Sequence, residues 1–281
     1  MAELPREPLI SVVTPAYGAA AYLEELIESV RAQDYPRIEH IIIDDGSQDG
    51  GATVAILRRF PHLRWWSREN KGQFPTLNEG IQAASGDVLT IISADDRYVT
   101  PKAFSRVIAH WRAHPEFGLV YGRVRHIDPE GAPLPFESSV EPRGPFSPWM
   151  LRHRSCIYHC SMFVERSLVS GRGIWFDPEF RFLGDWDWIS RLLAAGAVAG
   201  YIDEPLSEYR HHPEQVTNTT RSEIWRAEAR SICERNHASY RLCLMLHRVY
   251  GYRHRGLRLS WLLRTGGPRL VAQRLARKLR G

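Results

Sequence analysis

Pairs of carboxylates stand at the ends of two apolar segments of this 281-residue sequence. Asp44 and Asp45 directly follow three isoleucines, and Asp95 and Asp96 close the run DVLTIISADD. Like charges held close together raise each other's pKa, so two such pairs in one place need a compensating cation. Carboxylate oxygens suit Mg²⁺ or Mn²⁺, which keep positions open for phosphate oxygens. The pattern predicts a site for a metal ion and a phosphate.

Each pair also has a simpler explanation, which is capping. Asp44 and Asp45 can cap the turn GSQDG, and Asp95 and Asp96 can cap a helix formed by PKAFSRVIAHW. One acid is enough for a cap, whereas each site has two, so we prefer the binding explanation and leave capping open.

A third acidic cluster, GDWDW, contains Asp185 and Asp187. On a helix these side chains diverge by about 200°, so that one can face a ligand while the other faces away. A carboxylate brought to a metal and phosphate site from a separate segment can act as a general base on a hydroxyl. The alternative is a pair of acids that favour the helix dipole.

The surrounding pattern predicts how these acids are positioned. Apolar runs and helical periodicity alternate along the first hundred residues, which predicts an open α/β sheet, mainly parallel and flanked by helices. Ligands bind beyond the carboxyl ends of strands in such sheets, so both acid pairs and the segment 14–17 are expected at one crevice. The predicted strands are 9–17, 38–44, 63–67 and 87–93, and the predicted helices are 19–33, 51–60 and 75–85.

The later pattern is looser. A strand over 118–128 precedes a proline-rich excursion, and residues 153–169 are expected to form a strand followed by a short helix. A helix is predicted over 182–194, with a last strand and loop over 201–218. Cys156 and Cys160 flank His159, but their spacing is poor for zinc, so we interpret them as core thiols.

Composition narrows the class of protein. A hydrophobic content of 43% indicates a globular core, and four cysteines do not suggest a disulfide framework. No run of about 18 apolar residues is present, and the start MAELPREPL has no apolar signal region. We therefore expect a cytoplasmic protein, with a peripheral contact on the cytoplasmic face of the membrane.

That membrane contact is predicted from the C-terminal charge. The net charge is +5, yet every charged residue from Arg248 to Arg280 is basic, so the rest of the chain is mildly acidic. Arginines interleaved with leucine and tryptophan suit an anionic membrane surface. Nucleic acid fits the charge equally, but no fold that binds it is recognisable, and none is expected as a partner. Packing of the tail on the acidic body stays open.

Five segments, taken together, resemble family-2 glycosyltransferases in order and spacing. They are ISVVTPAY, IIIDDGSQDG, NKGQFPTLNEGIQAASGDVLTIISADD, FLGDWDWISRL and YRHHPEQVT. Members are inverting enzymes that use sugar nucleotides and have the GT-A fold. The resemblance covers residues 8–220, with a nucleotide-binding half over 8–100 and an acceptor-binding half over 101–220. Residues 221–281 are expected to form a helical basic tail.

The resemblance implies a role for each matching residue. For the nucleotide it implies a pocket lined by Thr14, Pro15 and Tyr17, with Asp45 accepting from a ring N–H of the base and Asp95 serving the ribose. Asp96 would be the direct metal ligand, together with His212.

On the acceptor side the resemblance implies that Asp185 is the catalytic base. His159 and Trp186 would lie near the acceptor. One departure is Ser93, which stands where many members have a further acid. It leaves open which acid performs which task.

The implied function is a metal-dependent, inverting transfer of sugar from a nucleotide-sugar, with Mn²⁺ or Mg²⁺ as cofactor. A UDP-sugar is the expected donor, and thymidine or guanosine donors stay open. The acceptor would be a saccharide or lipid-linked saccharide in surface polysaccharide or glycolipid biosynthesis. Two alternatives are a catalytically inactive sugar-nucleotide-binding protein and a nucleotidyltransferase. The latter usually needs a glycine-rich basic phosphate loop, which TPAYGAAAY lacks.

Overall fold

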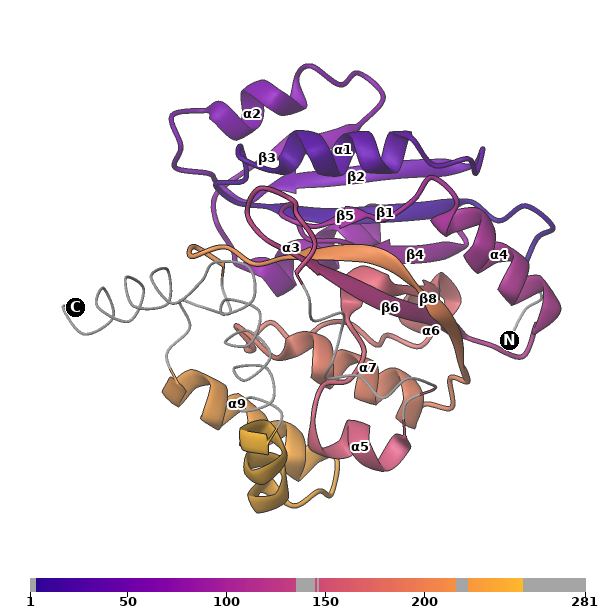
Figure 1. The fold of residues 1–281 in the computed structure, drawn as a ribbon, viewed down its shortest axis with the longest axis vertical. Coiled ribbons are helices and arrows are strands. Elements are labelled where there is room, and N and C mark those ends of the chain that lie inside the picture. The colour runs from indigo at the N-terminus through magenta and orange to yellow at the C-terminus, as the bar shows by residue number, and fades with distance from the viewer. Residues whose placement is uncertain (1–3, 135–144, 146, 216–221, 250–281) are drawn as a thin grey trace.

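The computed structural model describes residues 4–134, 145, 147–215 and 222–249 (Figure 1). A mixed eight-stranded sheet forms their centre, in the order β3-β2-β1-β4-β7-β6-β8-β5. The strands are β1 Ile10–Ala16, β2 Ile38–Asp44, β3 Arg64–Ser67, β4 Val88–Ile91, β5 Arg97–Tyr98, β6 Leu119–Ile127, β7 Met162–Glu165 and β8 Ala199–Arg210.

Helices cover both faces of the sheet. They are α1 Leu23–Arg31, α2 Ala52–Leu57, α3 Gln73–Ala83, α4 Ala103–Ala113, α5 Pro148–His153, α6 Arg166–Ser170, α7 Gly184–Ala194 and α9 Ser222–Arg235, with a short 3₁₀ helix η1 at His159–Ser161. Residues 240–249 are also helical. Among the described residues, no helix combines the length and the apolar character needed to cross a membrane.

The first half of the sheet confirms the predicted parallel arrangement. Strands β2, β1 and β4 run parallel, and β3 runs parallel to β2. Ala16 pairs with Asp44, and Val13 pairs with Ile91, so these three strands end at the same edge. The acids that follow β2 and β4 are therefore brought together by strand register.

The second half departs from a simple alternation. β7 is antiparallel to both β4 and β6, whereas β8 runs parallel to β6. The strand expected within residues 153–169 begins only at Met162, because the preceding turn is 3₁₀ and Ser161 donates its hydroxyl to the carbonyl of Arg123 at 2.8 Å. The apolar letters before Met162 reflect burial, not a strand.

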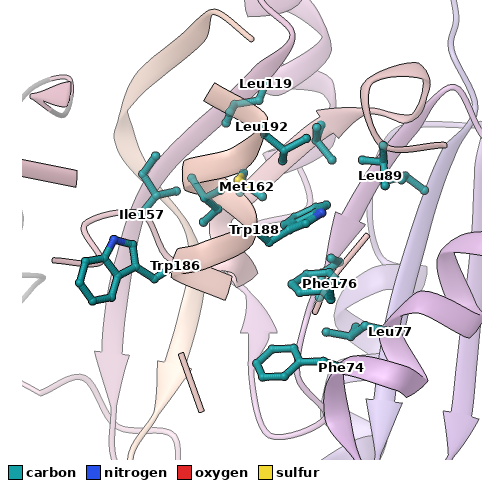
Figure 2. Close-up of a cluster of buried hydrophobic side chains, with 14 of the residues drawn as sticks. Phe74, Leu77, Leu89, Leu119, Ile157, Met162, Phe176, Trp186, Trp188 and Leu192 are labelled. Carbon is teal, nitrogen blue, oxygen red and sulfur yellow. The ribbon is translucent and has the colours of Figure 1, made fainter. Parts of the chain in front are cut away.

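Alternating side chains of the strands divide the core between the two faces. Val12 and Ile42 face α1, α2 and α4, whereas Val13, Ile41 and Ile43 face α3 and α7. On the second face an aromatic stack joins α3 to α7 (Figure 2). Its ring centroids lie 5.5 Å apart between Phe74 and Phe176, and 4.3 Å apart between Phe176 and Trp188.

Helix α9 belongs to the same core, although it begins inside the segment predicted as a basic tail. It lies beside α7 in Figure 1, and its buried residues Ala229, Ile232 and Cys233 pack into the cluster that contains Trp188. The folded body therefore continues past residue 220. Residues 250–281, on which the predicted membrane contact depends, lie outside the described ranges, so that contact stays a prediction.

Glu228 of α9 holds the segment that leads into α7. Its buried carboxylate accepts backbone N–H groups from Arg181 at 2.7 Å, Phe182 at 3.1 Å and Leu183 at 2.7 Å. Leu183 is the N-cap residue of α7 and the other two donors precede it, so this carboxylate fixes the chain where it enters the helix.

Replacement of Glu228 by alanine should lower the free energy of unfolding by about 3 kcal/mol, because three buried N–H donors lose a charged acceptor. Urea unfolding followed by tryptophan fluorescence measures the change. Glu234→Ala, at an exposed position of the same helix, is the control and should stay within about 0.5 kcal/mol of wild type. Equal unfolding midpoints for all three proteins would contradict the anchoring role.

His40 of β2 is a buried neutral histidine. Its Nε2 lies 3.2 Å from the hydroxyl of Thr14. Burial, with a smaller contribution from His62, lowers the pKa of His40 to about 3. Because the unfolded chain takes up this proton near pH 6.5 and the folded chain does not, the contribution of His40 to stability is complete above pH 6.5 and is lost as the pH falls.

A His40→Gln variant should therefore lose less stability on acidification than wild type. Between pH 6 and 4.5 the difference in slope should approach about 1.4 kcal/mol per pH unit, measured by urea unfolding at each pH. His114→Gln, at an exposed position, should follow wild type. Parallel curves for wild type and His40→Gln would show that His40 is protonated in the folded protein.

Candidate active site

A cavity of about 720 Å³ opens at the carboxyl ends of β1, β2 and β4. It is also bordered by η1, by the start of α7 and by the segment after β8. The structure brings nine of the ten residues predicted for the site to this cavity. They are Pro15, Tyr17, Asp45, Asp95, Asp96, His159, Asp185, Trp186 and His212.

Thr14 is the exception, since it is not among the residues that border the cavity. Side chains of a strand alternate between its faces, and Thr14 shares the face of Val12 and Ala16. Its hydroxyl contacts His40 inside the fold. Tyr17, one residue beyond β1, borders the cavity and is 56% exposed.

The two acids of the first pair have different roles, since Asp44 lies in the turn and Asp45 lies at the cavity. Asp44 is buried and builds the turn: its Oδ1 accepts the backbone N–H of Ser47 at 3.2 Å, and its Oδ2 accepts the hydroxyl of Ser67 at 2.5 Å. Asp45 borders the cavity, where its carboxylate pairs with Arg68. It also accepts the N–H groups of Lys71 at 2.8 Å and Gly72 at 3.0 Å.

The third residue of the motif DDG, Gly46, is required by the backbone at this position. Its φ is +73°, in the left-handed region, and a Cβ there would lie 2.8 Å from the backbone nitrogen of Asn70. Only glycine fits both the angle and the close approach. The residue lets the loop 68–72 close over Asp45.

Both acids of the second pair border the cavity, but their contacts differ. The Asp95 carboxylate borders the cavity, with its Oδ2 at 2.9 Å from Nε2 of His212. Asp96 is 1% exposed, and its Oδ1 accepts the backbone N–H of Arg210 at 2.9 Å. Burial, and then the charge of Asp95, raise the pKa of Asp96 well above its usual range. Neither acid caps α4, whose N-terminus has no side-chain cap.

Arg210 is a residue of the site that the sequence analysis missed. It is fully buried, and its guanidinium donates to the carbonyls of Asp95 at 2.8 Å and Pro129 at 2.9 Å. It also pairs with Glu25 at 2.6 Å and lies 4.5 Å from the ring centroid of Tyr22. An arginine at the end of β8, two residues before the candidate ligand His212, was the available signal. The arginine holds the backbone beneath Asp95.

The third pair is divided like the first pair. Asp187 is buried and pairs with Arg191 at 2.7 Å and with Arg235 of α9 at 3.0 Å. Asp185 lies in the first turn of α7 and borders the cavity. Its Oδ1 accepts the N–H of Trp186 at 2.7 Å, and its Oδ2 lies 3.3 Å from Nδ1 of His159.

Gly184 allows the close packing that sets the position of Asp185. A Cβ at this position would lie 2.7 Å from the ring of Phe74, so a larger residue would push α7 away from α3. Phe74 is also the first ring of the stack in Figure 2. The motif GDWDW thus combines a packing glycine, a cavity-facing acid and a core tryptophan.

Trp186 borders the cavity from within the core. It is 1% exposed, and its indole N–H donates to the carbonyl of Leu151 at 2.6 Å. Trp188 is fully buried and donates to the carbonyl of Ile174 at 2.8 Å. The wall that Trp186 offers to a ligand is therefore small.

In the described part of the chain no group of three histidine, cysteine, aspartate or glutamate side chains is arranged to hold an ion, and two donors could hold one. Asp95 and His212 converge at the cavity. One carboxylate and one imidazole fit Mn²⁺ and leave coordination positions for oxygens of a ligand.

Comparison with known proteins gives the family. A model described as glycosyl transferase family 2 matches residues 11–168. An uncharacterised glycosyltransferase of Rickettsia typhi is 30% identical over 79% of this chain and 70% of its own length. The O-antigen biosynthesis protein RfbC of Myxococcus xanthus is 30% identical over 75% of this chain, which spans only 16% of RfbC.

Solved structures share the fold. Residues 1–349 of S. aureus TarS in complex with UDP superpose with a TM-score of 0.62 at 17% identity, covering 88% of this chain and 71% of that one. The mannosyltransferase PcManGT of Pyrobaculum calidifontis, in complex with GDP-Man and Mn²⁺, gives 0.57 at 16% identity, covering 99% and 83%. With a family model that matches more than half of its length, the chain belongs to glycosyltransferase family 2 and is a transferase with the GT-A fold.

Proposed function

We propose that this transferase moves a sugar from a nucleotide-sugar to a hydroxyl of a saccharide or lipid-linked saccharide, with inversion at the anomeric carbon. The observation that carries the proposal is the meeting of Asp45, Asp95 and Asp185 at one cavity. These residues come from separate segments, each held by its own structural contacts.

The donor side of the proposal uses Tyr17 and Asp45. Two backbone N–H groups and Arg68 fix the Asp45 carboxylate, which keeps acceptor capacity for a ring N–H of a pyrimidine base. TarS is solved with UDP and with UDP-GlcNAc, and PcManGT with GDP-Man. These complexes support a nucleoside diphosphate sugar as donor, and we propose uridine as its base.

Asp95 and His212 would hold the metal, in place of Asp96, which the sequence favoured. Asp96 is buried and is engaged by the backbone of Arg210, whereas Asp95 and His212 contact each other at the cavity. Between the two predicted ions the imidazole favours Mn²⁺, because Mg²⁺ prefers oxygen ligands. A bound cation would stabilise the negative charge of the leaving diphosphate.

Asp185 would act as the base. The acceptor hydroxyl gives its proton to the Asp185 carboxylate while its oxygen forms the bond to the anomeric carbon, and the bond from that carbon to the diphosphate oxygen breaks. One displacement inverts the configuration. The buried contacts of Asp187 and Glu228 keep α7, and with it Asp185, in place during this step.

A role in surface polysaccharide or glycolipid biosynthesis is supported by RfbC, which is named for O-antigen biosynthesis. A lipid-linked acceptor would suit contact between the basic C-terminal segment and the cytoplasmic face of the membrane, which remains part of the proposal. Between the open alternatives, turnover distinguishes a transferase from an inactive binding protein.

An Asp185→Asn variant should lose about a thousandfold in turnover, because the amide cannot take up the acceptor proton. The assay follows release of nucleoside diphosphate from UDP-GlcNAc or GDP-Man. Binding of UDP, measured by titration calorimetry with Mn²⁺, should stay within threefold of wild type. Asp203→Asn, at an exposed position, is the control. Normal turnover by Asp185→Asn would exclude this residue as the base.

Metal dependence is tested by chelation. EDTA should abolish turnover and added Mn²⁺ should restore it, with Mg²⁺ less effective. In Asp95→Asn the Mn²⁺ concentration for half-maximal activity should rise at least tenfold, since a charged ligand is lost. Full activity in EDTA would show that the reaction does not need a metal. An unchanged Mn²⁺ requirement in Asp95→Asn would show that Asp95 is not a metal ligand.

A further inference from the structure

We infer that His159 is a positioning residue for the Asp185 carboxylate, and that Ser93 in turn fixes the imidazole of His159. The inference rests on the proposed role of Asp185 as base. It stands on one hydrogen-bonded chain: Oγ of Ser93 lies 3.2 Å from Nε2 of His159, and Nδ1 of His159 lies 3.3 Å from Oδ2 of Asp185.

The chain joins three segments that are far apart in the sequence. Ser93 follows β4, His159 opens η1, and Asp185 lies in the first turn of α7. All three border the cavity, yet the side chains of His159 and Asp185 are only 14% and 23% exposed. A contact at this depth is shielded from water, so its geometry is held better than that of a surface pair.

The contacts determine which nitrogen of His159 carries the proton. An ionised carboxylate can only accept hydrogen bonds, so Nδ1 must donate to Asp185. In the neutral ring Nε2 is then an acceptor, and the Ser93 hydroxyl can donate to it. Because both contacts are satisfied by a neutral imidazole, the chain needs no second charge beside the acid.

The result is a carboxylate with a partner on each oxygen. The N–H of Trp186 binds Oδ1, and the N–H of His159 binds Oδ2. These two donors fix the rotation of the carboxylate about its last bond. Each oxygen can accept a second hydrogen bond, so acceptor capacity remains for the incoming hydroxyl.

This role differs from the acceptor contact predicted for His159 from the sequence. Both ring nitrogens are already engaged, one by Ser93 and one by Asp185. A direct hydrogen bond from His159 to a sugar would have to replace one of them. His159 therefore acts on the reaction through Asp185.

The tautomer is the first test, and it needs no substrate. Long-range ¹H–¹⁵N correlation spectra of the full-length protein, labelled at histidine, report which ring nitrogen is protonated. The signals of His159 are those absent from a His159→Asn variant. We expect protonated Nδ1 and bare Nε2 in the wild type. Protonation at Nε2 alone, or at both nitrogens, at pH 8 would overturn the inference.

Kinetics provide the second test. His159→Ala should lower kcat for nucleoside diphosphate release from UDP-GlcNAc or GDP-Man by about ten- to a hundredfold, with the donor KM within threefold of wild type. His159→Asn, whose amide can donate from near the place of Nδ1, should recover most of this loss. Ser93→Ala should lower kcat several-fold in the wild-type background and leave kcat unchanged in the His159→Asn background.

The outcomes are distinct. A loss in His159→Ala that His159→Asn does not recover, or an unchanged kcat in His159→Ala, would overturn the positioning role. If wild type neither binds UDP nor turns over these donors, the proposed function fails. The NMR experiment still tests the hydrogen-bonded chain in that case, because a protonated Nδ1 supports the contact between His159 and Asp185 and an unprotonated Nδ1 excludes it. If Ser93→Ala has equal effects in both backgrounds, Ser93 does not act through His159.

Discussion

Electrostatic repulsion among carboxylates is the constraint on which this site depends. Asp45, Asp95, Asp96 and Asp185 border one cavity, and burial together with the charge of Asp95 raises the pKa of Asp96. The fold compensates each acid separately: Arg68 and two backbone N–H groups hold Asp45, His212 lies beside Asp95, and His159 and a helix N–H hold Asp185. Each compensating group comes from a different segment from its acid, apart from the neighbouring N–H of Trp186. The site can therefore form only when the whole domain has folded.

The second acid of each pair explains why single acids would not be enough. Asp44 forms the turn that carries Asp45, and Asp96 binds the backbone of Arg210, whose side chain supports the carbonyl of Asp95. Asp187 pairs with arginines of α7 and α9. The turn-capping role that the sequence offered is found for Asp44, whereas neither acid of the second pair caps α4. Asp44, Asp96 and Asp187 are bound to other groups of the protein, and every acid of the three pairs except Asp44 and Asp187 borders the cavity.

The sequence was sufficient for the parts that local periodicity encodes. The strands and helices of residues 9–93, and the convergence of Asp45 and Asp95, follow from alternation of elements and from the rule that parallel strands end at one edge. The contacts of the fully buried Arg210 and of the Glu228 carboxylate could not be predicted, because their partners lie about 45 to 185 positions away along the chain. Thr14 was predicted to line the pocket because it belongs to the segment 14–17 at the end of the first strand. Side chains alternate along that strand, and this alternation turns Thr14 toward His40 inside the fold.

The position of α9 has a consequence for how the cavity wall formed by α7 is held in place. Glu228 and Arg235 bind the segment before α7 and the buried Asp187, so the helix that carries Asp185 is held by α9, and both helices lie beyond the residues that the family model matches. Hydrophobic packing alone would let α7 slide along α3, because stacked rings such as Phe74 and Phe176 tolerate small shifts. Ion pairs and N–H contacts at fixed positions do not. The placement of Asp185, the proposed base, thus depends on polar contacts that its helix makes away from the cavity, and sequence motifs do not predict these contacts.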